Sequence, residues 1–160
     1  MIDSPEPTWL SPSAALKLQE EYDRLTTVGR IEATERIAEA RSHGDIRENA
    51  DYDAAKNEQG FMEARIRKLR QILDTAEIRE VTDTSRVAVG CLVTVRGEGG
   101  DEMEFLVAPQ ENKVSGLLLA SPSSPLGAAL MGAAVGDRVD YEAPGGTFTY
   151  EIAAIRPYEA

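Results

Sequence analysis

Two long segments of the chain carry apolar residues at helical spacing, and a short polar segment separates them. The first segment holds two series of such residues, with a change of register between them. The series are Leu18, Tyr22 and Leu25, and then Ala33, Ile37, Ala40 and Gly44. Steps of three and four positions place side chains on one face of a helix. The spacing therefore predicts a helix that begins near Ser11 or Ser13, either of which can serve as its N-cap, and reaches His43.

The change of register falls near Gly29. Glycine and the preceding β-branched Thr26-Thr27-Val28 both lower helix stability at this point. We therefore expect a bend or break in the helix near Gly29.

The second segment has the most regular apolar spacing in the chain. Its positions advance alternately by four and three residues, and they are Ala55, Gln59, Met62, Ile66, Leu69, Leu73 and Ala76. Taken alone, this heptad pattern favours a coiled coil between two chains. The Gly44-Asp45 step between two segments of similar length instead favours one chain folded back on itself. We therefore expect a helical hairpin in a protein that is monomeric when free.

After Glu80 the pattern changes to the alternation that is typical of strands. Strands are predicted at residues 89–95, 103–107, 117–119, 138–141 and 147–155. One short helix interrupts them, with Ser124 as N-cap, Pro125 at the first helical position and Gly132 as a left-handed stop. This half is predicted to be a small antiparallel sheet with one covering helix, and the fold class is α+β.

The same change of pattern predicts the domain organisation. Residues 1–80 are predicted to form the N-terminal coiled-coil hairpin, with an acidic tip at residues 43–52. Residues 81–86 read as a polar linker, and residues 87–160 as the sheet domain. The single cysteine, Cys91, lies in a strand pattern and is expected to be a core thiol.

Composition and charge limit the classes of function. The 160-residue chain has 17 Lys and Arg against 28 Asp and Glu, a formal net charge of -11. Broad binding to a nucleic acid backbone needs clustered cations, so any contact with nucleic acid must be local or guided by a partner. No apolar run approaches the length of a membrane span, and the N-terminus lacks the pattern of a secretory signal. We therefore expect a cytoplasmic protein that contacts no membrane.

The tip segment carries two carboxylates three residues apart, Asp45 and Glu48. This is the spacing of a capping box at the start of the second helix, which explains both residues without any further function. The same carboxylates can also hold a divalent metal ion, but two ligands are too few for a tight Mg²⁺ site without waters and substrate phosphates. Both interpretations can hold together if one carboxylate caps the helix in the free protein and turns to the metal in a complex.

Two segments carry a family resemblance. One is the tip segment Gly44-Asp45-Ile46-Arg47-Glu48-Asn49-Ala50-Asp51-Tyr52-Asp53-Ala54-Ala55-Lys56. The other is the C-terminal set of Ser124 to Gly132, Val135-Gly136-Asp137 and Pro144-Gly145-Gly146. Both resemble the Gre family of bacterial transcript cleavage factors, in its GreA-like branch, and together they cover nearly the whole chain in the family's order.

The resemblance implies a partner and a mechanism. In the family, a C-terminal domain of FKBP-like fold docks at the rim of the RNA polymerase secondary channel. The coiled coil reaches the active site and stimulates the polymerase's own cleavage of backtracked RNA. Asp45 and Glu48 match the acids that hold a second Mg²⁺ and help orient the attacking water. Arg41 and Lys56 match basic positions that contact the RNA 3′ end, and Ser124-Pro125 lies in the docking segment.

On this resemblance the chain is not an enzyme by itself, and it binds no Mg²⁺ tightly without the polymerase. A Gre-like paralogue that occupies the channel as a regulator or inhibitor is the first alternative, which the Asp45/Glu48 pair disfavours. Asp53 stands where the family usually has His, and Asn57 where an acidic or similar residue is common, and these departures bear on RNA affinity and metal tuning. A coiled-coil chaperone or adaptor independent of polymerase fits the acidic charge but not the C-terminal resemblance.

Overall fold

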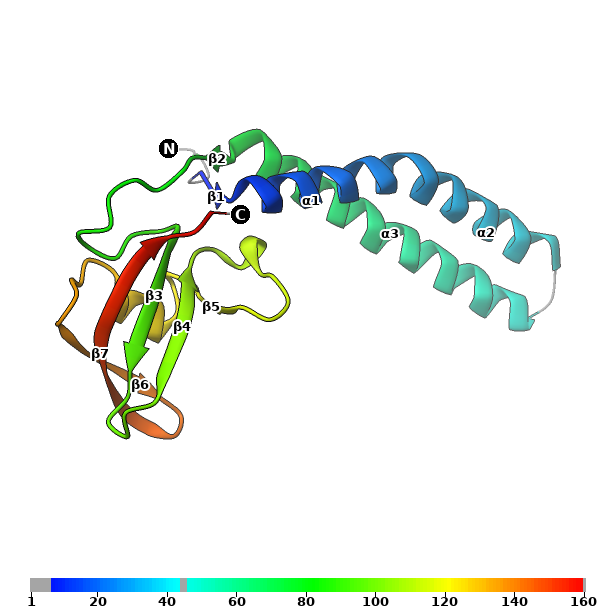
Figure 1. Ribbon diagram of the computed structural model, residues 1–160. Helices are drawn as coiled ribbons and strands as arrows, with labels where there is room; N and C mark the ends of the chain where they lie inside the picture. Colours follow the sequence, from blue (N-terminus) through cyan, green and yellow to red (C-terminus); the bar gives the residue numbers. More distant parts are fainter. Residues whose placement is uncertain (1–6, 44–45, 160) are drawn as a thin grey trace, which may run out of the picture. The chain divides into compact units, whose positions relative to one another are not determined.

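The chain forms two compact units. The structure is a computed structural model that describes residues 7–43 and 46–159, without the side chains of residues 43 and 46–49. One unit is Leu16–Thr75, and the other combines the N-terminal residues through Ala15 with the chain from Ala76 onward (Figure 1). Residues 7–15 therefore group with the sheet, whereas the sequence pattern assigned all of residues 1–80 to the hairpin.

The helical unit is a hairpin of two arms. The first arm consists of α1 (Pro12–Arg24), the π-helical η1 (Leu25–Gly29) and α2 (Arg30–His43), and the second arm is α3 (Ile46–Thr75). Figure 1 shows the two arms running side by side in opposite directions. The predicted helical hairpin and the α+β class are confirmed.

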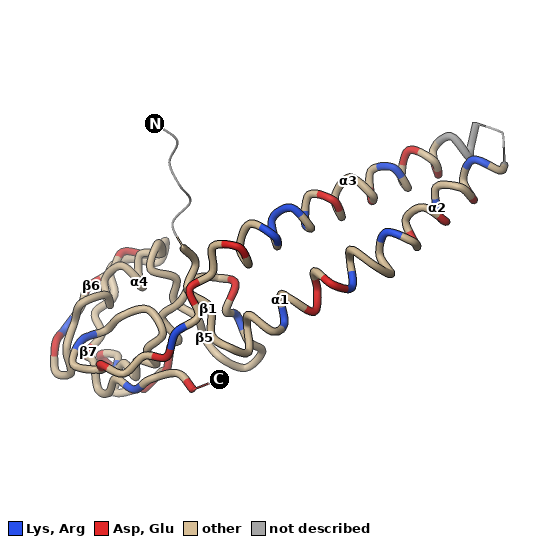
Figure 2. Tube along the Cα trace, turned by 90° about the horizontal axis from the view of Figure 1, so that it is seen from above, with Lys and Arg blue, Asp and Glu red and all other residues tan. Residues whose placement is uncertain are grey.

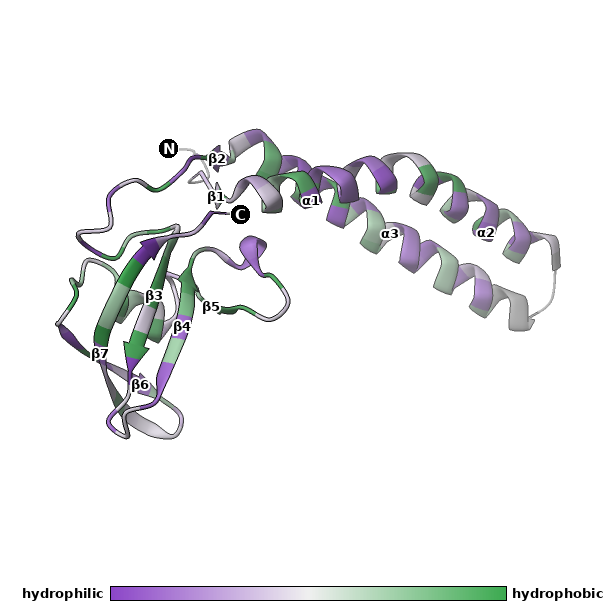
Figure 3. Ribbon diagram, in the orientation of Figure 1, coloured by the Kyte–Doolittle hydropathy of each residue, from purple (hydrophilic) through white to green (hydrophobic). Residues whose placement is uncertain are grey.

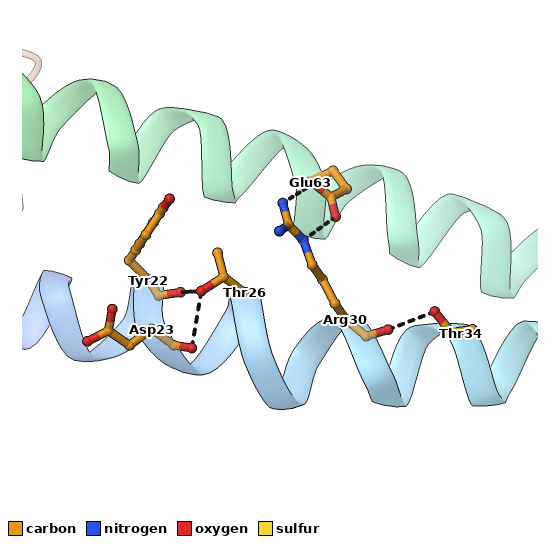
Figure 4. A network of polar contacts seen from close by, with 6 residues as sticks. All are labelled: Tyr22, Asp23, Thr26, Arg30, Thr34 and Glu63. Carbon is orange, nitrogen blue, oxygen red and sulfur yellow. Dashed lines mark hydrogen bonds and ion pairs between the residues drawn. The ribbon is translucent and has the colours of Figure 1, made fainter.

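Of the bend or break expected near Gly29, the break is wrong, because the helix continues through a π-helical turn. Residues on both sides of η1 have ordinary right-handed helical angles, with φ -64° at Arg24 and -65° at Arg30. The Thr26 hydroxyl donates to the Tyr22 carbonyl oxygen at 2.8 Å (Figure 4). A π turn inserts one extra residue into the helical path, and this insertion accounts for the change of register in the apolar pattern.

Gly29 is buried where the two arms come together. A Cβ atom at this position would lie 3.2 Å from the Met62 sulfur on α3, which is tighter than ordinary contact. The two hydroxyls of Thr26 and Thr27 bond to backbone carbonyls one turn earlier, and such bonds satisfy carbonyls that a widened turn leaves exposed. The glycine is therefore required by the close approach of α3 rather than by a break in the helix.

The buried face of α3 follows the predicted heptad positions over most of its length. Ala55, Ile66 and Leu69 are all buried, and Leu69 is fully so. Near the end of the helix Ile72 is buried while Leu73 is only half-buried. Adjacent residues of an α-helix lie about 100° apart around its axis, so the buried face of α3 turns toward Ile72 near the end of the helix.

In the part of the chain that the structure describes, three Arg–Glu pairs join the two arms. Arg65 binds Glu21 through two nitrogen–oxygen contacts of 2.7 and 2.9 Å, and Arg30 binds Glu63 through contacts of 3.0 and 3.1 Å. The third pair is Arg36 with Glu58. The hydrogen bonds from Arg65 and Arg30 lower the pKa of the Glu21 and Glu63 carboxyls. These pairs connect the two arms and so help to fix their alignment. Figure 2 shows basic and acidic residues interspersed along both arms, so neither arm presents a continuous basic surface in the part of the chain that the structure describes.

The other unit contains a five-stranded sheet with the strand order β5-β4-β3-β7-β6. Its strands are β3 (Cys91–Arg96), β4 (Glu102–Val107), β5 (Leu118–Ala120), β6 (Arg138–Ala143) and β7 (Gly146–Pro157). All neighbours are antiparallel except β4 and β5, which pair in parallel. Figure 3 shows the most hydrophobic residues concentrated in β3, β4 and β7, which include the central strands of the sheet.

The N-terminal residues pack on this sheet. β1 (Trp9–Leu10) pairs in parallel with β2 (Glu77–Ile78), and Trp9 lies in a buried cluster with Leu92 and Leu106. Asn112, in the 3₁₀ helix η2 (Gln110–Asn112), is fully buried. Its side-chain oxygen accepts a hydrogen bond from the Ser11 backbone N–H at 2.8 Å, and its amide nitrogen donates to the Trp9 carbonyl at 2.8 Å. A buried amide needs such partners, so Asn112 ties residues 9–11 to the sheet.

The predicted short helix is confirmed as α4 (Pro125–Leu130). The Ser124 hydroxyl accepts a hydrogen bond from the Gly127 N–H at 3.1 Å, and Gly132 has the left-handed φ of 80°. Ser11 caps α1 in the same way, since its hydroxyl accepts from the Ala14 N–H at 3.1 Å. Both helices therefore begin where serine caps predicted.

Gly127→Ala is expected to destabilise the sheet unit by about 1–3 kcal/mol, because the added methyl overpacks this site. A Cβ at position 127 would lie 1.8 Å from the Ser121 carbonyl oxygen, a backbone atom that cannot turn away. Gly60→Ala is the matched control, since no heavy atom lies within 4 Å of a Cβ there. Urea unfolding followed by circular dichroism measures both, and similar midpoints for the two variants would contradict the assigned packing of α4.

Candidate functional site

The tip of the hairpin lies between the end of α2 at His43 and the start of α3 at Ile46. Asp45 lies outside the described residues, and Glu48 belongs to the first turn of α3 with its side chain outside them. The capping box and the metal site both fall there, and each stays a prediction.

Arg41 and Tyr52 meet across the two arms near the tip. The central carbon of the Arg41 guanidinium lies 5.5 Å from the centre of the Tyr52 ring. This distance is within the range of about 6 Å in which a cation is attracted to the negative face of an aromatic ring. The sequence pattern selected Arg41 but did not identify Tyr52 as its partner.

Lys56, the second predicted RNA contact, lies on the second arm. Its side chain is exposed, and its ammonium donates to the Gln59 side-chain oxygen at 3.3 Å. A contact of this length to the half-buried Gln59 leaves the exposed ammonium accessible to a phosphate group. The two basic residues therefore come from opposite arms, and only Arg41 contacts the other arm through an aromatic ring.

A shallow groove of about 320 Å³ runs between the arms next to the tip. Its lining residues are Arg36, Glu39, Ala40, Asp51, Ala54, Ala55 and Glu58. Among the residues that the structure describes, no three His, Cys, Asp or Glu side chains are grouped so that they could hold a metal ion.

Ser124 and Pro125, the predicted docking residues, have a visible structural role. The Ser124 hydroxyl donates to the Ser121 carbonyl oxygen at 2.6 Å while it caps α4, and Pro125 occupies the first helical position. Their part in docking stays a prediction. Two exposed apolar side chains follow α4, Met131 at 39% and Val135 at 57% exposure. No helix among the described residues is long and apolar enough to cross a membrane.

Comparisons with known proteins match both halves of the chain. A family model described as "Transcription elongation factor, N-terminal" matches residues 8–78, and one described as "Transcription elongation factor, GreA/GreB, C-term" matches residues 82–157. A transcription elongation factor GreA of Streptomyces coelicolor is 43% identical over 155 residues, 94% of each chain. The GreA of Thermoanaerobacter pseudethanolicus is 39% identical over 160 residues, 94% of this chain and 98% of its own.

Solved structures with similar chains were also found. The crystal structure of GreA factor homolog 1 of Thermus thermophilus is 27% identical, with a TM-score of 0.44 over 94% of this chain and 99% of its own. A GreA/GreB structure from Nitrosomonas europaea is 17% identical, with a TM-score of 0.40 over 92% and 98%.

Proposed function

The chain belongs to the GreA/GreB family of transcription elongation factors, and from this premise we propose that it binds RNA polymerase and stimulates the polymerase's own cleavage of backtracked RNA. The hairpin enters the secondary channel with its tip at the active site. The sheet domain docks at the rim of the channel through the segment that contains Ser124 and Pro125. The chain supplies side chains to the reaction and cleaves no RNA by itself.

The position of the tip acids carries this proposal. Asp45 directly precedes α3 in the sequence, and Glu48 belongs to the first turn of that helix, at the end of a hairpin only two helices wide. A hairpin end of this width has no core beneath it, so its residues can enter a narrow channel. The alignment of the two arms by Arg–Glu pairs supports delivery of the tip as one rigid element.

Asp45 and Glu48 are proposed to hold Mg²⁺ only together with ligands from the polymerase. Carboxylate oxygens are the donors that Mg²⁺ prefers, and its sites commonly use one or two protein carboxylates with waters and substrate phosphates. A second metal in such a site would stabilise the attacking and leaving oxygens of the phosphoryl group. The two carboxylates of the chain would orient the ion and a water molecule beside the RNA.

Arg41 and Lys56 are proposed to face the RNA 3′ end. They place positive charge on both arms beside an acidic tip, in a chain whose formal charge of -11 provides no general attraction for phosphates. A local pair of cations suits an RNA end that the polymerase itself guides into the channel.

The proposal is tested by incubating the full chain with a stalled, backtracked cognate polymerase complex and Mg²⁺, and by separating the RNA products on a gel. Shortened RNA that appears only when both chain and polymerase are present is the expected result. Binding to polymerase without cleavage would instead favour the alternative function, a regulator that occupies the channel.

Residues 81–160 alone are expected to compete with the full chain for polymerase without stimulating cleavage, because they lack the tip. They also lack Trp9, which is 5% exposed in the sheet unit, and the backbone partners of Asn112. The fragment should therefore melt at a lower temperature than a fragment extended by a linked copy of residues 7–15. A fragment of either kind that restores cleavage would contradict the assigned division of labour.

A further inference from the structure

We infer that Arg41 and Tyr52 form a clamp between the two arms that positions the tip acids for stimulated cleavage. Arg41 thereby acts as a positioning residue through Tyr52, in addition to any contact with RNA. This inference rests on the proposed function for its effect on cleavage. The clamp itself is a property of the free chain and can be tested there.

The geometry of the pair suits a clamp. Arg41 lies in the last turn of α2 and Tyr52 in the second turn of α3, with 5.5 Å between the guanidinium carbon and the ring centre. Arg41 is exposed while Tyr52 is half-buried, so the ring is held in place and the guanidinium covers its face. A planar guanidinium stacks on an aromatic face more effectively than the compact ammonium of lysine does.

The clamp is placed symmetrically about the tip acids. Arg41 is four positions before Asp45, and Tyr52 is four positions after Glu48. Four positions make about one helical turn, so Tyr52 lies one turn farther along α3 than Glu48. A contact between Arg41 and Tyr52 therefore limits how far the two arms can separate beside the acids.

Neighbouring contacts hold the arms together farther from the tip. Ala40 and Ala55 are buried, at 8% and 4% exposure, and two small side chains let the helix backbones approach closely. The Arg36–Glu58 pair joins the arms beyond them. The Arg41–Tyr52 contact is the next contact between the arms toward the turn. Close to the turn, a displacement of the acids by 1 Å would lower the rate of stimulated cleavage by about a hundredfold.

The test uses three variants of the full chain in the RNA cleavage assay. Arg41→Lys and Tyr52→Leu keep a positive charge at position 41, and therefore any phosphate contact, but weaken or remove the stacking. Both are expected to lower cleavage at saturating chain by about tenfold and to raise the Mg²⁺ concentration needed for half-maximal cleavage. Tyr52→Phe keeps the ring face and should restore parent values. Polymerase affinity should stay at the parent value in all three.

Two outcomes in this assay would overturn the clamp. Parent-level cleavage by Tyr52→Leu would leave Arg41 as an RNA contact only. Equal losses for Tyr52→Phe and Tyr52→Leu would assign the effect to the phenol hydroxyl instead of the ring face.

Amide hydrogen exchange in the free chain separates the clamp from the proposed function. Arg41→Lys and Tyr52→Leu should speed exchange at residues 50–54 by about two- to fivefold, the factor that corresponds to one exposed cation–π contact. Tyr52→Phe and the distant Lys68→Ala should exchange like the parent. A parent chain that stimulates no cleavage would refute the proposed function, while the exchange rates of the free chain would still test the clamp. Unchanged exchange in Tyr52→Leu would refute the clamp alone.

Discussion

Asp45→Asn is expected to remove most of the stimulated RNA cleavage while the melting temperature and the polymerase affinity stay close to those of the parent. Asn can still accept the N-cap hydrogen bond before α3, so a residue that only caps the helix predicts a nearly normal protein. Asn lacks the negative charge that attracts Mg²⁺, so a metal-holding residue predicts a loss of about 10- to 100-fold or more. The variant therefore separates the two interpretations of the same spacing.

Glu48→Gln extends the same test to the second acid, with the same expected loss. Added Mg²⁺ should restore part of the cleavage in both variants, because mass action refills a weakened site. Glu35→Gln is the matched control, since Glu35 is an exposed acid on α2 and loses the same charge away from the tip. Cleavage is measured on gels across a Mg²⁺ titration, beside thermal melting and polymerase binding.

Full cleavage by a folded, polymerase-bound Asp45→Asn protein would remove the catalytic assignment. A regulator that occupies the channel would then be the better explanation of the hairpin. Loss of cleavage at an unchanged melting temperature would assign the loss to the missing charge, because Asn keeps the N-cap hydrogen bond.

The hairpin was predictable because its periodicity is local, but the π turn was not recognised from the same pattern. A change of register is compatible with a break, a bend or an inserted residue. The structure selects the insertion, since the hydroxyls of Thr26 and Thr27 bond to the carbonyls of Tyr22 and Asp23 and Gly29 packs against Met62. The sequence signal for the inserted residue was the hydroxyl-bearing, β-branched pair Thr26-Thr27 shortly before the buried Gly29.

The contacts of the N-terminal residues could not be predicted from local patterns. Ser11 and Asn112 are 101 positions apart, and a hydrogen bond between them leaves no periodic trace in the sequence. The parallel pairing of β4 and β5 could not be predicted either, because the three residues of β5 carry no pattern that indicates the direction of the strand. Such pairings are decided by the packing of the sheet as a whole.

The site was predictable only in part. Asp45 and Glu48 were selected by their spacing, and the family resemblance added Arg41 and Lys56, but neither signal says how side chains contact one another. Counting outward from the turn would not have paired Arg41 with Tyr52, because Arg41 lies three positions before Gly44 and Tyr52 seven positions after Asp45. The periodic pattern did not reveal this pair because Arg41 lies outside the apolar positions of the first arm, although Tyr52 continues the heptad series three positions before Ala55.

Leu69→Ala is the stability change with the largest expected effect. Leu69 is fully buried on α3, and truncation of a buried leucine costs about 2–5 kcal/mol because it removes apolar contacts and leaves a cavity. Lys68→Ala is the control at the neighbouring position, where an exposed lysine is replaced by a residue that favours helices at least as well.

The two variants are compared by urea unfolding followed by helix circular dichroism. Leu69→Ala should move the midpoint to lower urea while Lys68→Ala stays near the parent, and equal shifts would mean that the buried face of α3 is wrongly assigned.

Cleavage by Leu69→Ala at a temperature where the variant stays folded should remain near the parent value. The tip acids lie about 30 Å from position 69 at 1.5 Å of rise per residue, so a cavity there should loosen the hairpin without displacing the acids. A strong loss of cleavage in the folded variant would show instead that a cavity at position 69 displaces the acids.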